Sequence, residues 1–252
     1  MVLRENFSKK ARKWGLILVS LFLSLLLIGY VFLTVKTYRP TALAYERLEK
    51  AHTQTGSYSY FEPESSNHAK ESLIIYGGGL VDSRSYSYLA QELAEKDYPV
   101  YLLHSPLNLP ILRQGQALKL IEEKNLQSVY LIGHSLGGVV AAKDSSEGQS
   151  AVSGLILLAS YPAPGLDLSS AEHLALLSIT ASQDQILNWQ QYENSKPYLP
   201  KKARYVTLEG GNHSGFGLYG QQSGDGQASI SPQQQQDLVT QTIHDFIQNY
   251  HQ

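Results

Sequence analysis

From residue 72 onward, short apolar runs alternate with segments that have the periodicity of amphipathic helices. The run SLIIY (72–76) is followed by SRSYSYLAQELAEK, in which apolar residues recur three and four positions apart. Continuous apolar strands that alternate with helices are typical of a parallel sheet covered by helices on both faces. The sequence therefore predicts an α/β fold with a mostly parallel sheet. Further strand-like runs lie at 99–104, 128–133, 154–159, 174–180 and 203–209.

The chain ends in a predicted helix with a recognisable start. Ser231 can cap it, Pro232 suits its first position, and Gln234 is placed for a capping box. The four glutamines at 233–236 are then expected to form the exposed first turn of this helix.

Residues 15–35 form an uncharged apolar run of 21 residues. At about 1.5 Å per residue, a helix of this length spans roughly 30 Å, the thickness of a bilayer's hydrocarbon core. Five basic residues and one acidic residue precede the run, which favours a cytoplasmic N-terminus and export of the rest. We predict a cytoplasmic segment (1–14), a transmembrane signal anchor (15–35), a juxtamembrane stalk (36–70) and a catalytic domain (71–252).

A cleavable signal peptide is the alternative to an anchor. Its apolar region is ordinarily about 7–15 residues long, shorter than the run seen here. The segment TALA, which ends at Ala44, offers small residues at the spacing that a signal peptidase requires. Secretion after cleavage near Ala44 therefore stays open.

The composition excludes several classes of protein. The 252-residue chain has no cysteine, so the exported part must be stabilised by its core rather than by disulfides. Its formal charge is −2, and without the five basic residues and one acidic residue of the first thirteen it becomes −6. A mildly acidic domain argues against a nucleic-acid partner. The sequence shows no cluster of metal ligands, so neither a metal nor an organic cofactor is expected, and it predicts no oligomeric state.

The strand-like run at 128–133 leads into GHSLGG (133–138), a G-x-S-x-G motif with Ser135 at its centre. A strand before the motif and a helix after it are the context of a nucleophile elbow, a sharp turn that exposes the serine. Gly133 and Gly137 would supply the room that such a turn needs. The N-terminus of the following helix would aim N–H groups, that of Leu136 among them, at a developing oxyanion.

A serine nucleophile needs a base, and the base needs an orienting carboxylate. On a fold of this kind the chain order is serine, acid, histidine. Asp184, in ASQD, and His213, in GGNH, follow two successive strand-like runs in that order. Asp225 is the rival acid, but it lies downstream of His213 and breaks the order. Asp184 has an alternative reading as a helix cap.

The remaining part of such a site is a second oxyanion donor, expected from the glycine-rich loop after SLIIY. Gly78 and Gly79 are the candidates. His104 also follows a strand and could line the pocket, although a surface histidine is the simpler reading, and His134 is expected to point away from the site. Residues 214–226 are interpreted as an active-site loop over the histidine.

The segments YGGG, GHSLGG, ASQD and GGNH make the chain from about residue 72 resemble the α/β-hydrolase superfamily, and it looks closest to small lidless members related to dienelactone hydrolases. Members of that branch use cysteine as the nucleophile. Ser135 at the matching position implies serine-esterase chemistry. Only SYPAPGLDLSSAEH separates two strands where the family's lid is normally inserted, so the resemblance implies no large cap domain and an accessible, small site.

The sequence thus predicts a membrane-anchored extracytoplasmic serine hydrolase, acting on a small-molecule or lipid-like ester through Ser135, Asp184 and His213. Two alternatives remain open. One is an acyltransferase or amidase that acts on cell-envelope material with the same residues, because a fold does not determine a reaction. The other is a non-catalytic surface binding module on a hydrolase scaffold.

Overall fold

The computed structural model describes residues 2–63, 65, 71–148 and 151–250. The chain divides into two compact units, Met1–Thr37 and Tyr38–Gln252, and each is described by itself. The first unit is the helix α1 (Val2–Lys36). Its segment Arg12–Lys36 is long and apolar enough to cross a membrane, and the predicted span lies within it.

The second unit is built on one eight-stranded sheet with the strand order β1-β2-β4-β3-β5-β6-β7-β8. All neighbouring pairs from β4 to β8 are parallel, whereas β1 and β2 join antiparallel at one edge, so the predicted mostly parallel sheet is confirmed. The strands are β1 (Thr53–Gln54), β2 (Tyr58–Phe61), β3 (Ser72–Tyr76), β4 (Val100–Leu103), β5 (Val129–His134), β6 (Val152–Leu158), β7 (Ala175–Ala181) and β8 (Arg204–Leu208).

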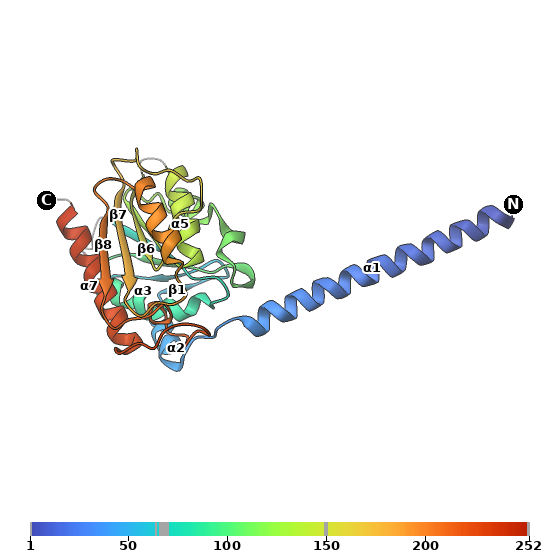
Figure 1. Ribbon diagram of the computed structural model, residues 1–252, viewed down its shortest axis with the longest axis horizontal. Coiled ribbons are helices and arrows are strands. Elements are labelled where there is room, and N and C mark those ends of the chain that lie inside the picture. Colours follow the sequence, from blue (N-terminus) through green and yellow to red (C-terminus); the bar gives the residue numbers. More distant parts are fainter. Residues whose placement is uncertain (1, 64, 66–70, 149–150, 251–252) are drawn as a thin grey trace. The chain divides into compact units, whose positions relative to one another are not determined.

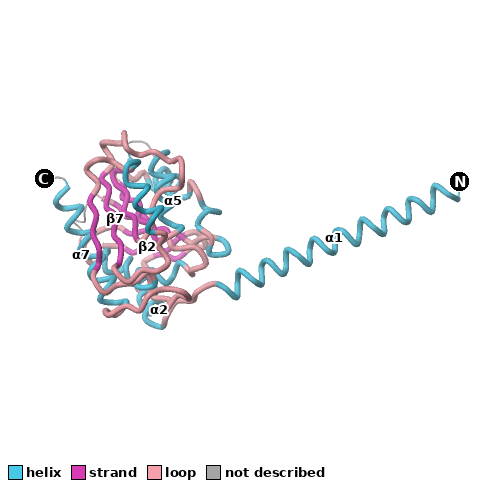
Figure 2. The backbone as a smooth tube through the Cα atoms, viewed as in Figure 1, coloured by secondary structure: helices cyan, strands magenta, loops and turns pink. Residues whose placement is uncertain are grey.

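Helices cover both faces of this sheet (Figures 1 and 2). Because successive side chains of a strand point to opposite faces, Leu73 and Ile75 of β3 pack in one core, with residues of α3 (Ser87–Ala94) and α7 (Pro232–Tyr250). Ile74 and Tyr76 pack in the other core, with residues of α4 (Gln116–Lys124) and α5 (Leu136–Glu147). Each fully buried Leu or Ile stabilises the fold by roughly 1.5–3 kcal/mol. The helices are α2 (Ala42–Leu48), α3 (Ser87–Ala94), α4 (Gln116–Lys124), α5 (Leu136–Glu147), α6 (Trp189–Ser195) and α7 (Pro232–Tyr250).

The predicted stalk is wrong for residues 38–61, which belong to the folded domain. This segment contains α2, whose Ala44 and Leu48 are buried, and the two edge strands β1 and β2. Sequence periodicity missed β2 because its inward positions are serine and phenylalanine between tyrosines, which do not form a continuous apolar run. The rest of the predicted stalk includes residues 64 and 66–70, which lie outside the described residues.

The start of α7 is partly as predicted. Ser231 Oγ accepts a hydrogen bond from the Gln234 N–H at 3.2 Å, and Gln234 Oε1 accepts one from the Ser231 N–H at 2.9 Å, so the capping box is confirmed. The expected exposure of all four glutamines is wrong, because Gln235 and Gln236 are fully buried. Gln235 exchanges two hydrogen bonds with the backbone of Asn212, and it thereby ties α7 to the loop that follows β8.

Candidate active site

The candidate site lies where the parallel strands end. Loops after the C-terminal ends of parallel strands meet at one edge of a sheet, and ligands bind there in open α/β folds. Ser135 follows β5, Asp184 follows β7 and His213 follows β8. We call this edge of the sheet the catalytic edge.

Ser135 stands in a strained turn between β5 and α5, with φ 52° and ψ −122°. A residue other than glycine adopts such a conformation at a cost of about 1–3 kcal/mol, and it persists only where the surroundings impose it. A side chain on Gly137 would lie 2.3 Å from the carbonyl oxygen of Gly77, and one on Gly133 would collide with the backbone of Gly138. The two outer glycines of the motif are therefore required by packing.

Two hydrogen bonds hold this turn against β6. The Ser135 N–H donates to the carbonyl oxygen of Leu158 at 3.0 Å, and Ser160 Oγ donates to the carbonyl oxygen of Ser135 at 2.6 Å. Ser135 itself is half-buried. Sequence reasoning missed Ser160, because its contact depends on how β6 lies beside β5.

Asp184 and His213, predicted as the acid and the base, are in direct contact. His213 Nδ1 and Asp184 Oδ2 are 2.8 Å apart, and both side chains are almost completely buried. Asp184 Oδ1 accepts hydrogen bonds from the N–H groups of Ile186 and Leu187, each at 2.8 Å. An acceptor-only carboxylate at Nδ1 places the ring proton there and leaves Nε2 as the lone-pair nitrogen.

Asp225, the rival acid, contacts the same loop but not the imidazole ring. Its Oδ2 accepts hydrogen bonds from the N–H of Ser214 at 2.8 Å and from Ser214 Oγ at 2.6 Å. Its Oδ1 accepts a longer bond, 3.4 Å, from the backbone N–H of His213. Asp225 therefore fixes the backbone that carries His213, whereas Asp184 orients its ring.

The fold brings His213 beside the elbow. Its ring centroid is 4.5 Å from that of His134, the residue before Ser135. In the described part of the chain, no hydrogen bond joins Ser135 Oγ to His213. Such bonds are often long in free enzymes and shorten when substrate binds.

The two candidate loop glycines differ in what their N–H groups do. The Gly78 N–H donates to Tyr86 Oη at 2.8 Å, so it is already used inside the protein. Gly79 faces Leu136, since a side chain at Gly79 would lie 2.9 Å from the Leu136 methyl carbon Cδ2. Leu136 is the first residue of α5, and the first N–H groups of a helix have no partner within the helix. Gly79 and Leu136 are therefore better placed as an oxyanion-binding pair than Gly78.

Tyr86 and His134 form a buried pair. The sequence led us to expect His134 to point away from the site, but its ring lies beside that of His213. Tyr86 Oη accepts a hydrogen bond from the Gly78 N–H and lies 2.8 Å from His134 Nδ1. Complete burial lowers the pKa of His134 well below its usual range, the nearby His213 lowers it further, and burial raises the pKa of Tyr86. His134 is therefore neutral, and its ring stacks on Phe216 at 5.5 Å between centroids. Nothing in the local sequence signals this pair, whose members lie 48 positions apart.

His104 lies in a separate polar cluster. Its Nδ1 is 2.7 Å from Ser83 Oγ, and its Nε2 is 2.9 Å from Ser59 Oγ. Burial lowers the pKa of His104 to about 4. It lines a cavity of about 430 Å³ together with Asp82 and Arg84, and Ser135 is not among the residues that line this cavity.

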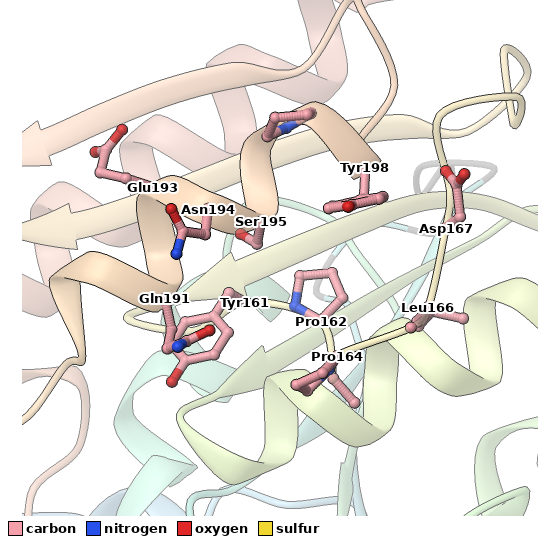
Figure 3. Close-up of a pocket in the computed structure, with 13 residues that line it drawn as sticks. Tyr161, Pro162, Pro164, Leu166, Asp167, Gln191, Glu193, Asn194, Ser195 and Tyr198 are labelled. Atoms are coloured by element: carbon pink, nitrogen blue, oxygen red, sulfur yellow. The ribbon is translucent and has the colours of Figure 1, made fainter.

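A larger cavity, of about 790 Å³, lies between the loop after β6 and α6, and neither Ser135 nor His213 is among the residues that line it. It begins at Tyr161, the residue after Ser160, and Figure 3 shows Tyr161 next to Gln191 of α6. Pro162 and Pro164 line it on the loop side, and Tyr198 lies farther along. Among the residues described, no group of three or more His, Asp or Glu side chains could hold a metal ion.

Comparison with known proteins agrees with this architecture. The model of the alpha/beta hydrolase family matches residues 72–237, and the chain belongs to this family. Similar solved structures include a putative lipase from Acinetobacter baumannii AYE, with 16% identity, a TM-score of 0.58, and coverage of 82% of this chain and 95% of that one. Est1E from Butyrivibrio proteoclasticus has 14% identity, a TM-score of 0.55, and coverage of 76% and 93%. MenH from S. aureus has 12% identity, a TM-score of 0.57, and coverage of 79% and 100%.

At such low identities these structures share the fold alone. No match was found among curated protein sequences. The family and the fold class predicted from the sequence are thus confirmed, including the mostly parallel sheet without a large cap domain in the described residues. The kinship with the dienelactone-hydrolase branch stays a prediction. Its family makes the chain a hydrolase.

Proposed function

We propose that this hydrolase cleaves carboxylic esters with Ser135 as its nucleophile. The observation that carries the proposal is the buried contact between His213 Nδ1 and Asp184 Oδ2, 2.8 Å long, in a protein whose only strained serine follows β5 in the described residues. A serine, a histidine with an oriented ring and a buried carboxylate are the three groups that acyl transfer to a serine requires.

The proposed reaction has two halves. Ser135 Oγ attacks the ester carbonyl while His213 Nε2 takes its proton, and the N–H groups of Leu136 and Gly79 bind the resulting oxyanion. The oxyanion collapses, the C–O bond to the alcohol breaks, and His213 returns the proton to the leaving alkoxide. Water then attacks the acyl-enzyme with the same base, which releases the acid and restores Ser135. Asp184 stabilises the imidazolium that forms in each half.

The cavity beside Tyr161 is the proposed place for one part of the substrate. Its loop side carries two prolines and a tyrosine, and its α6 side carries amides and a carboxylate. Such a wall can pack an apolar group and hydrogen-bond a polar one. Because no large cap domain is present in the described residues, a substrate can enter this site without the opening of a lid.

We further propose that residues 15–35 anchor the enzyme in the cytoplasmic membrane, with residues 1–14 inside and the domain from Tyr38 outside. The hydropathy of α1 and the basic residues before its apolar run support this orientation. Cleavage near Ala44 is disfavoured, because it would remove Tyr38 and Thr41. Both donate backbone hydrogen bonds to loops at the catalytic edge.

A fluorophosphonate probe tests the nucleophile on the full chain in detergent. We expect it to label Ser135, to block hydrolysis of p-nitrophenyl acetate, and to leave the Ser135→Ala variant unlabelled. Hydrolysis that persists in Ser135→Ala would refute the mechanism. Labelling without hydrolysis would favour acyl transfer to another acceptor, and no labelling would favour a binding module.

A further inference from the structure

The segment that follows α1 is hydrogen-bonded to the loop expected to hold the oxyanion. Tyr38 forms a parallel β-bridge with Val81, five residues past the end of β3. The Tyr38 N–H donates to the carbonyl oxygen of Leu80 at 2.8 Å, and the Asp82 N–H donates to the carbonyl oxygen of Tyr38 at 3.0 Å. Leu80 directly follows Gly79, so these bonds support the backbone next to a candidate oxyanion donor.

The same segment is bonded to the loop that carries His213. The Thr41 N–H donates to the carbonyl oxygen of Leu218 at 2.8 Å, and the Ser223 N–H donates to Tyr38 Oη at 3.0 Å. The rings of Tyr38 and Tyr219 are also in contact, with centroids 5.6 Å apart. Residues 38–41 therefore join the two loops that flank Ser135.

The length of the chain limits how far this segment can lie from the end of the apolar helix. Lys36 is the last residue of α1, and Tyr38 is two residues further on. Two residues of fully extended chain span about 7 Å at most. With residues 15–35 in a bilayer, the covalent chain therefore limits how far Tyr38 can lie from the end of the apolar helix.

A loop at this edge exposes large apolar side chains. The loop after β4, Ser105–Gln114, leaves Leu107, Ile111 and Leu112 exposed by 39%, 57% and 54%. It is fixed in place, since its Asn108 carbonyl oxygen accepts a hydrogen bond of 2.7 Å from the Leu80 N–H. This apolar loop is thus tied to the loop that Tyr38 also supports.

The charges around the apolar loop suit an anionic surface. From Tyr98 to Ile121 the sequence contains no acidic residue, and its only formal charges are those of Arg113 and Lys119. Apolar side chains flanked by basic ones favour the boundary between lipid headgroups and acyl chains. A protein partner would need complementary pockets for these side chains, and the continuity with the membrane-bound helix favours lipid instead.

We propose that the apolar loop inserts Leu107, Ile111 and Leu112 into the outer leaflet, and that the substrate is an ester of an amphiphile resident in the bilayer. This rests on the proposed function and on the proposed anchor. The catalytic edge then lies on the lipid surface, and the substrate reaches Ser135 by lateral diffusion rather than from bulk water.

The position of the loop can be measured without reference to activity. Because the chain has no cysteine, Ile111→Cys provides a single site for an environment-sensitive fluorophore. The full chain is placed in vesicles of phosphatidylglycerol and phosphatidylcholine. We expect emission at residue 111 to shift to shorter wavelength and to be quenched by spin-labelled lipid. Tyr205→Cys on β8, itself 41% exposed, is the control, and its label should stay in water. A label at 111 that lipid does not quench overturns the proposal and favours a protein partner.

Two substrates then test what the loop does. The variant L107S/I111S/L112S should hydrolyse p-nitrophenyl acetate as the unaltered chain does. Hydrolysis of a long-chain fluorogenic ester dissolved in the vesicles should fall by at least about tenfold, since three apolar side chains no longer enter the leaflet. The matched variant Tyr205→Ser with Leu238→Ser should keep both activities.

Each outcome bears on a distinct claim. Equal activity on the vesicle ester before and after the triple substitution overturns the inference, and so does an equal loss on both esters. If neither ester is hydrolysed and the fluorophosphonate leaves Ser135 unlabelled, the proposed function fails, although quenching at residue 111 would still show the loop in lipid.

Discussion

Two histidines, His213 and His104, occupy similar places and have different surroundings. Each follows the end of a parallel strand, and each has a hydrogen-bonded Nδ1. At His213 the partner of Nδ1 is the carboxylate of Asp184, at 2.8 Å. At His104 both ring nitrogens are bonded to hydroxyl groups, those of Ser83 and Ser59.

The difference shows that the partner, rather than the position, decides what a buried histidine can do. A carboxylate compensates the charge of an imidazolium in a low-dielectric site and leaves Nε2 available. Neutral hydroxyls on both nitrogens compensate little charge and use both nitrogens. Burial therefore dominates at His104 and lowers its pKa to about 4. His104 is thus held neutral, whereas the contact with Asp184 suits the role of base that we propose for His213.

Replacing each of the two histidines should give the largest difference in kcat/KM between two variants. We expect His213→Gln to lower kcat/KM for p-nitrophenyl acetate by about 10³-fold or more, because the general base is lost. His104→Gln keeps hydrogen-bonding groups for both serines and should leave kcat/KM within about threefold, as for substitutions away from the reacting atoms. Comparable losses in the two variants would contradict the assignment of the base.

Substitution of the two acidic residues of the site should lower kcat to different extents. Asp184→Asn removes the charge at Nδ1 and favours the wrong ring tautomer, so kcat should fall by about 10³–10⁴-fold. Asp225→Asn alters only the backbone support of the histidine loop, and a loss of about tenfold at most is expected. Steady-state kinetics on the full chain measure both, and a larger effect at Asp225 would reverse the roles.

Tyr86 acts on the site through its neighbours, so its effect should be smaller. Tyr86→Phe leaves the Gly78 N–H and His134 Nδ1 buried without their partner, which costs about 1–3 kcal/mol of stability. We expect kcat to fall by about tenfold with KM nearly unchanged, because the loop next to Gly79 loosens.

A matched control for Tyr86 lies elsewhere in the fold. Tyr98 Oη is 3.1 Å from His244 Nδ1, a second tyrosine–histidine contact, between the segment before β4 and α7. Tyr98→Phe should leave kcat unchanged. If it slows turnover as much as Tyr86→Phe does, the effect reflects general loosening and not the site.

The smallest expected effect concerns stability against pH. His104 has a pKa of about 4 when folded, below its ordinary value near 6.5, so the unfolded chain binds the proton first as the pH falls. Stability is therefore lost between about pH 6.5 and pH 4. At pH 4.5 the loss from His104 should be at most about 2–3 kcal/mol, since the side chain is partly exposed.

Urea unfolding of the full chain in detergent, at pH 7 and at pH 4.5, checks this loss. His104→Gln should reduce the difference between the two pH values. Some of the difference should remain, because burial also lowers the pKa of His134. An unchanged difference in His104→Gln would show that His104 is not the titrating group.

Much of the fold and part of the candidate site were predictable from local sequence. The alternation of apolar runs and helical periods predicted the parallel sheet, because buried strands and amphipathic helices have their own short-range patterns. GHSLGG predicted a strand, a turn and a helix around Ser135, because the tight packing of that turn leaves no room for side chains at Gly133 and Gly137. Asp184 and His213 were predicted to lie near each other because each follows a parallel strand, and parallel strands end at one edge of the sheet.

Other features came only from contacts between distant parts of the chain. Residues 53–61 form no continuous apolar run and are structured because β2 pairs with β4, and Tyr38 is held because it pairs with Val81. Gly78 and Gly79 are identical in sequence and differ because Tyr86 reaches only the first. Gln235 is predicted from the sequence to be exposed, but it is buried because it hydrogen-bonds the backbone of Asn212.

The sequence by itself determined the class of fold, the apolar helix and the chemical types available at the ends of the strands, because these depend on residues a few positions apart. The tertiary structure decided which acid contacts the imidazole ring of His213, which glycine N–H is unused, and how the segment after α1 joins the catalytic edge. Each of these is a pairing of hydrogen-bonding groups from separate elements. Many such pairings are compatible with the local pattern, and only packing selects one of them.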